Sequence, residues 1–202
     1  MVKTLYLIRH AQSLPSETIH HTRWPLSPRG TRQTEALAGL LSPLRIRALY
    51  SSPFPRCLQT IDPFARRTGL PVVVRDGLRE RLLSETPIRD LEPIWVRSWD
   101  DFSFALPGCE TSTEASARFI DAIEAVLEAS GEDTVGVCTH GNVIGLFLHH
   151  LDPAYGREDA ERITNPDVLR LRVDGTTCVW DDRFALPGLE EIVSNHGDPT
   201  DA

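Results

Sequence analysis

Short apolar runs alternate along the chain with longer segments whose apolar residues recur at helical spacing. The run at residues 4–8 is compact and uninterrupted, as expected of a buried strand, and the run at residues 71–75 is rich in β-branched valine. Two later runs flank Asp174-Gly175, a dipeptide typical of a tight hairpin turn. The predicted strands cover residues 4–8, 47–50, 71–75, 134–138, 168–173 and 176–180.

The helical segments carry recognisable start and stop signals. Ser27 followed by Pro28 provides an N-cap and a proline at the first helical position, and Gly69 is a typical C-terminal stop. Pro63 lies inside its segment and predicts a kink or a split. Helices are predicted at 28–41, from 53 or 55 to about 69, after a capping box at 111–114, and at 142–151.

Alternating strands and helices predict an α/β fold, with a mostly parallel sheet covered by helices on both faces in three layers. The hairpin adds antiparallel strands at one edge of the sheet. Absence of repeats or linker-like stretches favours one domain over residues 1–202. Residues 81–110 are read as an excursion with one short helix, and the polar stretch from about 188 as a loose tail.

Composition narrows the class of protein further. With 41% hydrophobic and 25% charged residues, the chain is typical of a globular protein. The net charge of -8 and the pI near 5.3 argue against nucleic acid or an anionic membrane as a partner. The four cysteines are widely spaced and are read as free thiols of a reducing compartment. No apolar stretch has the length of a membrane span or a signal peptide, so a cytoplasmic location is expected.

Charged side chains follow the predicted strands. Arg9 and His10 come directly after the first strand, and Arg56 follows the second through Ser51-Ser52-Pro53. Glu80 lies beyond the third strand, and Thr139-His140-Gly141 closes the fourth. In open α/β sheets, ligands bind outside the carboxyl ends of the strands. The sequence therefore predicts two arginines, two histidines and one carboxylate on one rim.

These residue types suit phosphoryl transfer. Arg9 and Arg56 can clamp a phosphate and neutralise its equatorial oxygens. A neutral His10 is a competent nucleophile toward phosphorus, and a cationic His140 would donate to the same oxygens. Glu80 can protonate the departing alkoxide and then take a proton from water. Because the cations supply the charge, neither a metal nor another cofactor is expected.

The ordered motifs resemble the histidine phosphatase superfamily, also called phosphoglycerate mutase-like. In that family the first histidine is phosphorylated, the arginines and second histidine bind phosphate, and the glutamate donates the proton. By resemblance, these roles fall to His10, Arg9, Arg56, His140 and Glu80. The matching segments are Leu7-Ile8-Arg9-His10-Ala11, Pro25-Leu26-Ser27-Pro28-Arg29-Gly30 with Gln33, Ser51-Ser52-Pro53 with Arg56 and Gln59-Thr60, Leu78-Arg79-Glu80-Arg81, and Thr139-His140-Gly141.

The sequence leaves alternatives open for the catalytic acid and for the residues that contact the phosphate. Asp76 and Glu85 are nearby carboxylates that could replace Glu80 as the acid. Three further residues either contact the phosphate or merely cap and turn the chain. These are Ser13, Thr139 and Asn142.

The sequence says less about the roles of the paired histidines and of the tryptophans in the excursion than about the residues at the rim. His20-His21 is read as part of a mobile loop near the pocket, and His149-His150 as the end of a helix, in preference to metal ligands. Trp95 and Trp99 are read as core or lid residues, with substrate contact as the alternative.

The leading functional hypothesis is a metal-independent phosphatase that acts on a small phosphomonoester through a phosphohistidine. A phosphoglycerate or phosphosugar mutase is the first alternative. The mutase branch of the family carries adjacent basic residues downstream, whereas here only Arg89 and Arg97 lie between Arg81 and Arg118. A catalytically inactive protein that binds phosphorylated ligands is the second alternative. The identity of the substrate and the oligomeric state do not follow from the sequence.

Overall fold

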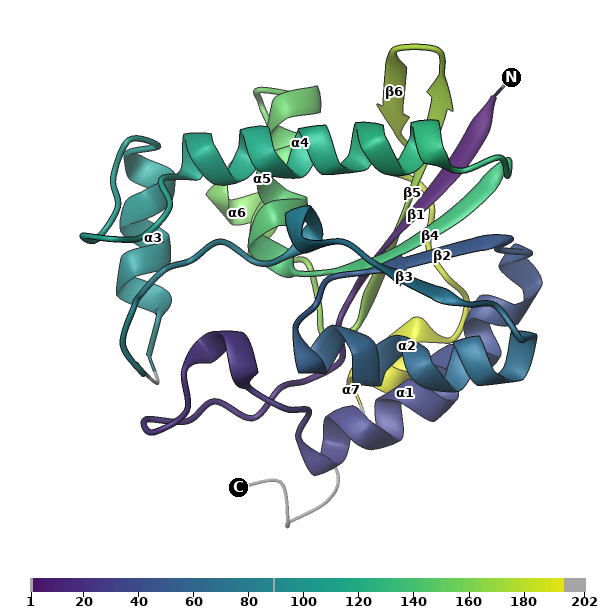
Figure 1. Cartoon of the computed structure of the whole chain (residues 1–202), viewed down its shortest axis with the longest axis horizontal. Coiled ribbons are helices and arrows are strands. Elements are labelled where there is room, and N and C mark those ends of the chain that lie inside the picture. Colours follow the sequence, from purple (N-terminus) through teal and green to yellow (C-terminus); the bar gives the residue numbers. More distant parts are fainter. Residues whose placement is uncertain (1, 89, 195–202) are drawn as a thin grey trace.

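The computed structural model describes residues 2–88 and 90–194, and these form a mixed sheet with helices on both sides (Figure 1). The six strands of this part lie in the order β3-β2-β4-β1-β5-β6. Strands β3, β2, β4 and β1 pair in parallel, whereas β5 and β6 are antiparallel at one edge. The strands are β1 (Lys3–Arg9), β2 (Ala48–Ser51), β3 (Val72–Val74), β4 (Thr134–Thr139), β5 (Asp167–Asp174) and β6 (Thr177–Trp180). The α/β prediction and the hairpin at the edge of the sheet are both confirmed.

Helices cover the two faces of the sheet in separate groups. Figure 1 shows α1, α2 and α7 on one face, with α4, α5 and α6 on the other and α3 beside them. The helices are α1 (Pro28–Leu41), α2 (Pro55–Thr68), α3 (Glu92–Asp100), α4 (Ser112–Ala129), α5 (Gly141–Leu151), α6 (Arg157–Ala160) and α7 (Leu189–Ser194). Three 3₁₀ turns join them, at η1 (His21–Arg23), η2 (Ser42–Leu44) and η3 (Asp76–Leu78).

The sheet has a hydrophobic core on each face, and alternate side chains of β1 contribute to the two cores. Leu5 and Leu7 pack with α4 and α5, whereas Tyr6 and Ile8 pack with α1 and α2. Successive side chains of a strand point to opposite faces, so a strand buried on both sides must be apolar throughout. This requirement accounts for the uninterrupted apolar run at residues 4–8.

Local signals fix the helix ends as the sequence predicts. Ser27 Oγ accepts a hydrogen bond from Gly30 N at 2.9 Å, and the capping box of α4 is formed. Gly69 ends α2 with a φ of 72°, in the left-handed region that favours glycine. The excursion contains the expected short helix, α3.

Two predictions need correction in part. Of the kink or split predicted at Pro63, the split is wrong, since α2 runs without a break from Pro55 to Thr68. Ile61 and Phe64 on either side of the proline are buried in the core, and this packing offsets the lost hydrogen bond. The tail predicted from about 188 begins with α7, whose Leu189 is buried. Residues 195–202 lie outside the described part of the chain.

Among the described helices, none is both long and apolar enough to cross a bilayer. The four cysteines are free, and Cys138 is fully buried, as expected of a small apolar core residue.

Candidate active site

Two neighbouring parallel strands bring the two histidines together. Arg9 and Thr139 are register partners at the ends of β1 and β4, and His10 N donates to Thr139 O at 3.0 Å. The next residues are therefore His10 and His140, whose ring centroids lie 5.2 Å apart. The parallel register, rather than any local sequence signal, sets this distance.

The imidazole of His10 is buried, with 6% of the residue exposed. Its Nδ1 lies 2.7 Å from the carbonyl oxygen of Ala11, which can only accept a hydrogen bond, so Nδ1 carries the proton. Nε2 is then unprotonated, and its lone pair accepts a hydrogen bond from Arg56 Nε at 3.0 Å. Burial lowers the pKa of His10 well below its usual value, and the charges of Arg56 and Arg9 act in the same direction. His10 is therefore neutral at pH 7.

Both predicted arginines reach the site from separate elements. Arg56 lies in the first turn of α2, and its Nη1 donates to the His21 carbonyl at 2.6 Å. Arg9 Nη1 donates to the Ile163 carbonyl, while the buried Arg9 Nε has no hydrogen-bond partner among the described residues. A Cβ at Gly141 would lie 2.7 Å from Arg9 Cζ. A side chain at this position would displace the guanidinium from its present place.

His140 is fully buried beside His10, at the N-cap position of α5. Its Nε2 lies 2.7 Å from Ser52 Oγ, and Phe54 packs edge-on against the ring. Burial lowers the pKa of His140 well below its usual value, with Arg56 adding to the effect. The free protein therefore holds a neutral His140, and the cationic form considered from the sequence is disfavoured without a bound anion.

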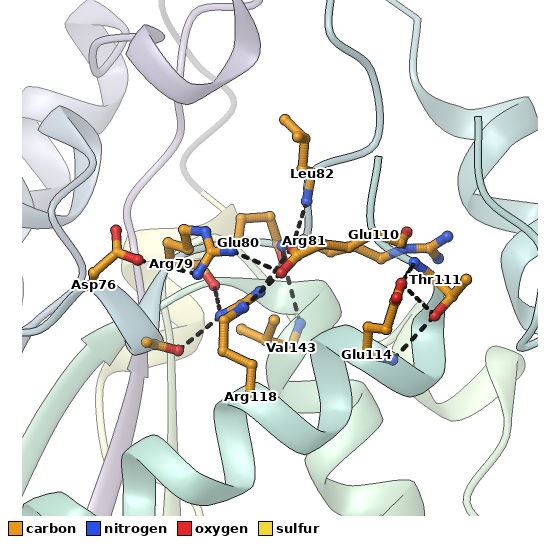
Figure 2. A network of polar contacts seen from close by, with 11 residues as sticks. Asp76, Arg79, Glu80, Arg81, Leu82, Glu110, Thr111, Glu114, Arg118 and Val143 are labelled. Atoms are coloured by element: carbon orange, nitrogen blue, oxygen red, sulfur yellow. Dashed lines mark hydrogen bonds and ion pairs between the residues drawn. The ribbon is translucent and has the colours of Figure 1, made fainter. Parts of the chain in front are cut away.

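Glu80 lies at the N-terminus of α5 (Figure 2). Its Oε2 accepts from Asn142 N and its Oε1 from Val143 N, each at 3.1 Å. Of the alternative acids, Asp76 is 79% exposed and pairs with Arg79, and Glu85 is also exposed. Glu80 lines the pocket beside His10, whereas neither alternative does.

The pocket in front of His10 has a volume of about 410 Å³. Its deep end is polar and includes Arg9, His10 and Arg56. Its outer wall comes from the segments at 12–26 and 81–110 and from residues 160, 161 and 165. The apolar side chains of this wall are Trp24, Leu83, Leu91, Trp95 and Ala160. Trp99 is buried behind Trp95, so the two tryptophans differ in position.

The three secondary phosphate candidates occupy different places. Ser13 and Asn142 line the pocket, and within the described part of the chain neither amide atom of the buried Asn142 side chain has a hydrogen-bond partner. Thr139 is fully buried, and its hydroxyl donates to the Leu78 carbonyl at 2.8 Å. Asn142 is thus free to bind a ligand, whereas Thr139 tethers the chain.

Two polar pocket residues need separate mention, His21, whose loop was predicted to lie near the pocket, and Asn165, which was not predicted. His21 lines the pocket, is only 2% exposed, and its Nε2 has no hydrogen-bond partner among the described residues. Burial lowers its pKa to about 4, with His20 and Arg56 adding to the effect. Asn165 also lines the pocket and donates to the His10 carbonyl at 2.9 Å. The adjacent histidines were the sole sequence signal for His21, and none pointed to Asn165.

His20 and His149 have ordinary protein partners. His20 Nε2 lies 2.7 Å from the Ser84 carbonyl and its Nδ1 lies 2.8 Å from Thr22 Oγ1. His149 Nδ1 lies 2.8 Å from the Tyr155 carbonyl. His20 therefore joins the loop at 12–26 to the excursion.

An α/β sheet with two imidazoles, two guanidiniums and a carboxylate at its carboxyl edge has the architecture of the histidine phosphatases. The chain belongs to the histidine phosphatase superfamily (branch 1), whose sequence profile matches residues 5–183.

Solved structures of low sequence identity share the fold. A phosphoglycerate mutase from Bacillus anthracis superimposes with a TM-score of 0.77 at 17% identity, over 95% of this chain and 96% of its own. A mycobacterial glucosyl-3-phosphoglycerate phosphatase gives a TM-score of 0.70 at 20% identity, over 89% of this chain and 96% of its own. Neighbours of this fold thus include both phosphatases and a mutase.

One curated relative is similar over a shorter stretch. The transcription factor tau 55 kDa subunit of Saccharomyces cerevisiae is 33% identical over 91 residues, which are 40% of this chain. The match spans 21% of that protein, so the chain corresponds to about a fifth of its length.

Proposed function

We propose that the protein is a phosphatase that hydrolyses small phosphomonoesters through a phosphohistidine at His10. The observation that carries the proposal is the contact between Arg56 Nε and His10 Nε2 at 3.0 Å. It leaves a neutral nucleophile facing a guanidinium that can hold the phosphoryl oxygens.

The first displacement forms the phosphoenzyme. When the phosphoryl group binds, Arg56 Nε donates to one of its oxygens instead of to His10 Nε2. The freed Nε2 lone pair of His10 attacks phosphorus in line, and the ester P–O bond breaks as the N–P bond forms. Arg9 and Arg56 stabilise the equatorial oxygens in the transition state. Glu80, in its protonated form, transfers its proton to the departing alkoxide, so the alcohol leaves neutral.

The second displacement regenerates the enzyme. Glu80, now a carboxylate, takes a proton from a water molecule that attacks phosphorus from the side vacated by the alcohol. The N–P bond breaks, its electron pair returns to His10 Nε2, and inorganic phosphate leaves. The proton taken from water restores the acid form of Glu80 for the next turnover.

The composition of the wall supports hydrolysis over a mutase reaction. A mutase must retain a second anionic group of its sugar-acid substrate, which calls for further cations. The described wall instead carries Glu92 and Glu161 among apolar side chains. Arg97 stacks on the Phe104 ring at 3.9 Å, away from the pocket, and Arg89 lies outside the described residues.

The test of the proposed function is an assay of both products. Incubation with simple aryl and alkyl phosphates should release inorganic phosphate, and 3-phosphoglycerate should yield no isomerised product. Isomerisation that outpaces phosphate release would favour the mutase. Binding of vanadate without turnover of any phosphomonoester would favour the inactive binding protein.

Arg56→Ala should weaken competitive inhibition by inorganic phosphate or vanadate by about 10–100-fold, because it removes a charge-assisted donor. Inhibition constants with p-nitrophenyl phosphate provide the measurement. Arg66→Ala is the matched control, since Arg66 lies on the same helix in an exposed pair with Asp62. If Arg56→Ala bound phosphate as tightly as the wild type does, Arg56 would not be one of the arginines that bind the phosphate.

We also infer that His21 Nε2 hydrogen-bonds the bound substrate, because a buried polar atom without a partner is destabilising unless a ligand satisfies it. His21→Ala should raise KM roughly 2–12-fold, the value of one neutral hydrogen bond, with a smaller change in kcat. His150→Ala, at an exposed histidine of α5, is the control. A KM equal to that of the wild type would contradict the contact.

A further inference from the structure

The carboxylate of Glu110 lies at the centre of a network that flanks Glu80 on both sides (Figure 2). Its Oε1 accepts from Arg79 at 2.8 Å and from Arg118 Nε at 2.7 Å. Its Oε2 accepts from Leu82 N at 3.0 Å and from Arg118 Nη2 at 3.0 Å. The side chain is 16% exposed. One carboxylate therefore holds the residue before Glu80 and the second residue after it.

The backbone of Glu110 adds to this attachment. Its N–H donates to the Leu82 carbonyl at 3.1 Å, and its carbonyl accepts from Arg81 Nε at 2.7 Å. Arg81 is 1% exposed and also donates to Ser112 Oγ. The neighbours of Glu80 are thus fixed to Glu110, while the Glu80 carboxylate accepts from Arg81 N at 2.9 Å and reaches the N-terminus of α5.

Helix α4 gives this network a rigid base. Glu110 directly precedes Thr111, the N-cap of an 18-residue helix with a complete capping box. Arg118, two turns along α4, donates through Nη1 to the Gly77 carbonyl at 2.7 Å and to the Arg79 carbonyl at 3.0 Å. The stretch that carries Glu80 is therefore bound to α4 at several points.

The charge of Glu110 balances two guanidiniums. Burial acts to raise its pKa, but the hydrogen bonds from Arg118 and Leu82 and the charge of Arg79 outweigh it, so the pKa lies below its usual value. Glu110 is ionised at neutral pH. Without this charge, Arg79 and Arg118 would face each other across an uncharged group and repel. Arg79 is covalently next to Glu80, so its displacement would move the acid.

We propose that Glu110 is a positioning residue that holds Glu80 where it exchanges protons with the leaving group and with water. The proposal rests on the proposed function, because it gives Glu110 no role except through the acid Glu80. Glu110 lies outside the pocket and bonds the residues on both sides of Glu80. Small displacements of a catalytic group strongly reduce its contribution.

Glu110→Gln keeps the shape of the side chain and can still accept from Leu82 N, but it removes the charge between the arginines. The pre-steady-state burst should fall on the order of tenfold for an alkyl phosphate and less than about twofold for p-nitrophenyl phosphate. Vanadate affinity should not change. Glu114→Gln is the matched control, because Glu114 lies four residues further along the chain, in the first turn of α4, and its carboxylate accepts from Thr111. This control should alter neither burst rate.

A double-mutant cycle separates positioning from general destabilisation. If Glu110 acts through Glu80, Glu110→Gln should cause no further loss in a Glu80→Gln background. Equal losses for the two substrates, or additive losses in the cycle, would overturn the proposal. Arg79→Ala, which releases one side of Glu80 and keeps the Glu110–Arg118 pair, should show the same substrate selectivity if Glu110→Gln does not fold. If the wild-type enzyme released inorganic phosphate from neither substrate, the proposed function itself would be refuted.

Discussion

His10→Ala should abolish turnover while the protein remains folded. The substitution removes the atom that forms the N–P bond, and removal of a nucleophile lowers kcat by several orders of magnitude, at least about 10⁴-fold. Stability should change little, because His10 lies at the edge of the core, where β1 ends and the pocket begins. Circular dichroism and thermal melting would test the fold.

The decisive measurement for His10 is covalent labelling. Wild-type enzyme quenched during turnover of a ³²P-labelled substrate should carry an acid-labile, base-stable label, as a phosphohistidine does. His10→Ala should carry none. His150→Ala, at an exposed histidine, should label as the wild type does. Label retained in His10→Ala would assign the nucleophile to another residue.

Glu80→Gln should slow phosphoenzyme formation steeply for an alkyl phosphate and only slightly for p-nitrophenyl phosphate. An alkoxide is a poor leaving group at neutral pH, so its protonation is worth on the order of 10²–10⁴ in rate. Nitrophenolate leaves well without a proton. Glutamine keeps the shape of Glu80 and one of the two oxygens that accept from Asn142 N and Val143 N, but it has no proton to give.

Burst kinetics are needed to measure this effect. Glu80 also activates the water in the second displacement, so steady-state rates would fall for both substrates alike. The burst reports the first displacement alone. An equal loss of burst rate for both substrates would make Glu80 structural. The exposed Asp76 and Glu85 would then become the next acids to test, although neither lines the pocket.

The sheet and the polar end of the pocket could be predicted because they depend on regular chain geometry. Apolar runs mark strands that are buried on both faces, as residues 4–8 show, and parallel strands present their carboxyl ends at one edge. Arg9, His10 and His140 follow such strands directly. Their convergence therefore needs no knowledge of tertiary contacts.

The wall of the pocket could not be predicted because it depends on long-range contacts without periodic signals. His21 became a pocket residue through the bond from Arg56 to its carbonyl and through the contact of His20 with Ser84. Neither contact has a local sequence signature. The unbroken helix through Pro63 likewise reflects packing that overrides a local preference.

The pairing of β1 with β4 also makes enzymatic activity a reporter of folding. The two imidazoles come from distant parts of the sequence and meet because Arg9 lies opposite Thr139. A slip of one residue would turn every side chain of β1 to the opposite face of the sheet, which would carry His10 away from Arg56. Recovery of turnover during refolding would therefore mark the moment at which the central strands reach their native register, whereas circular dichroism would follow the helices.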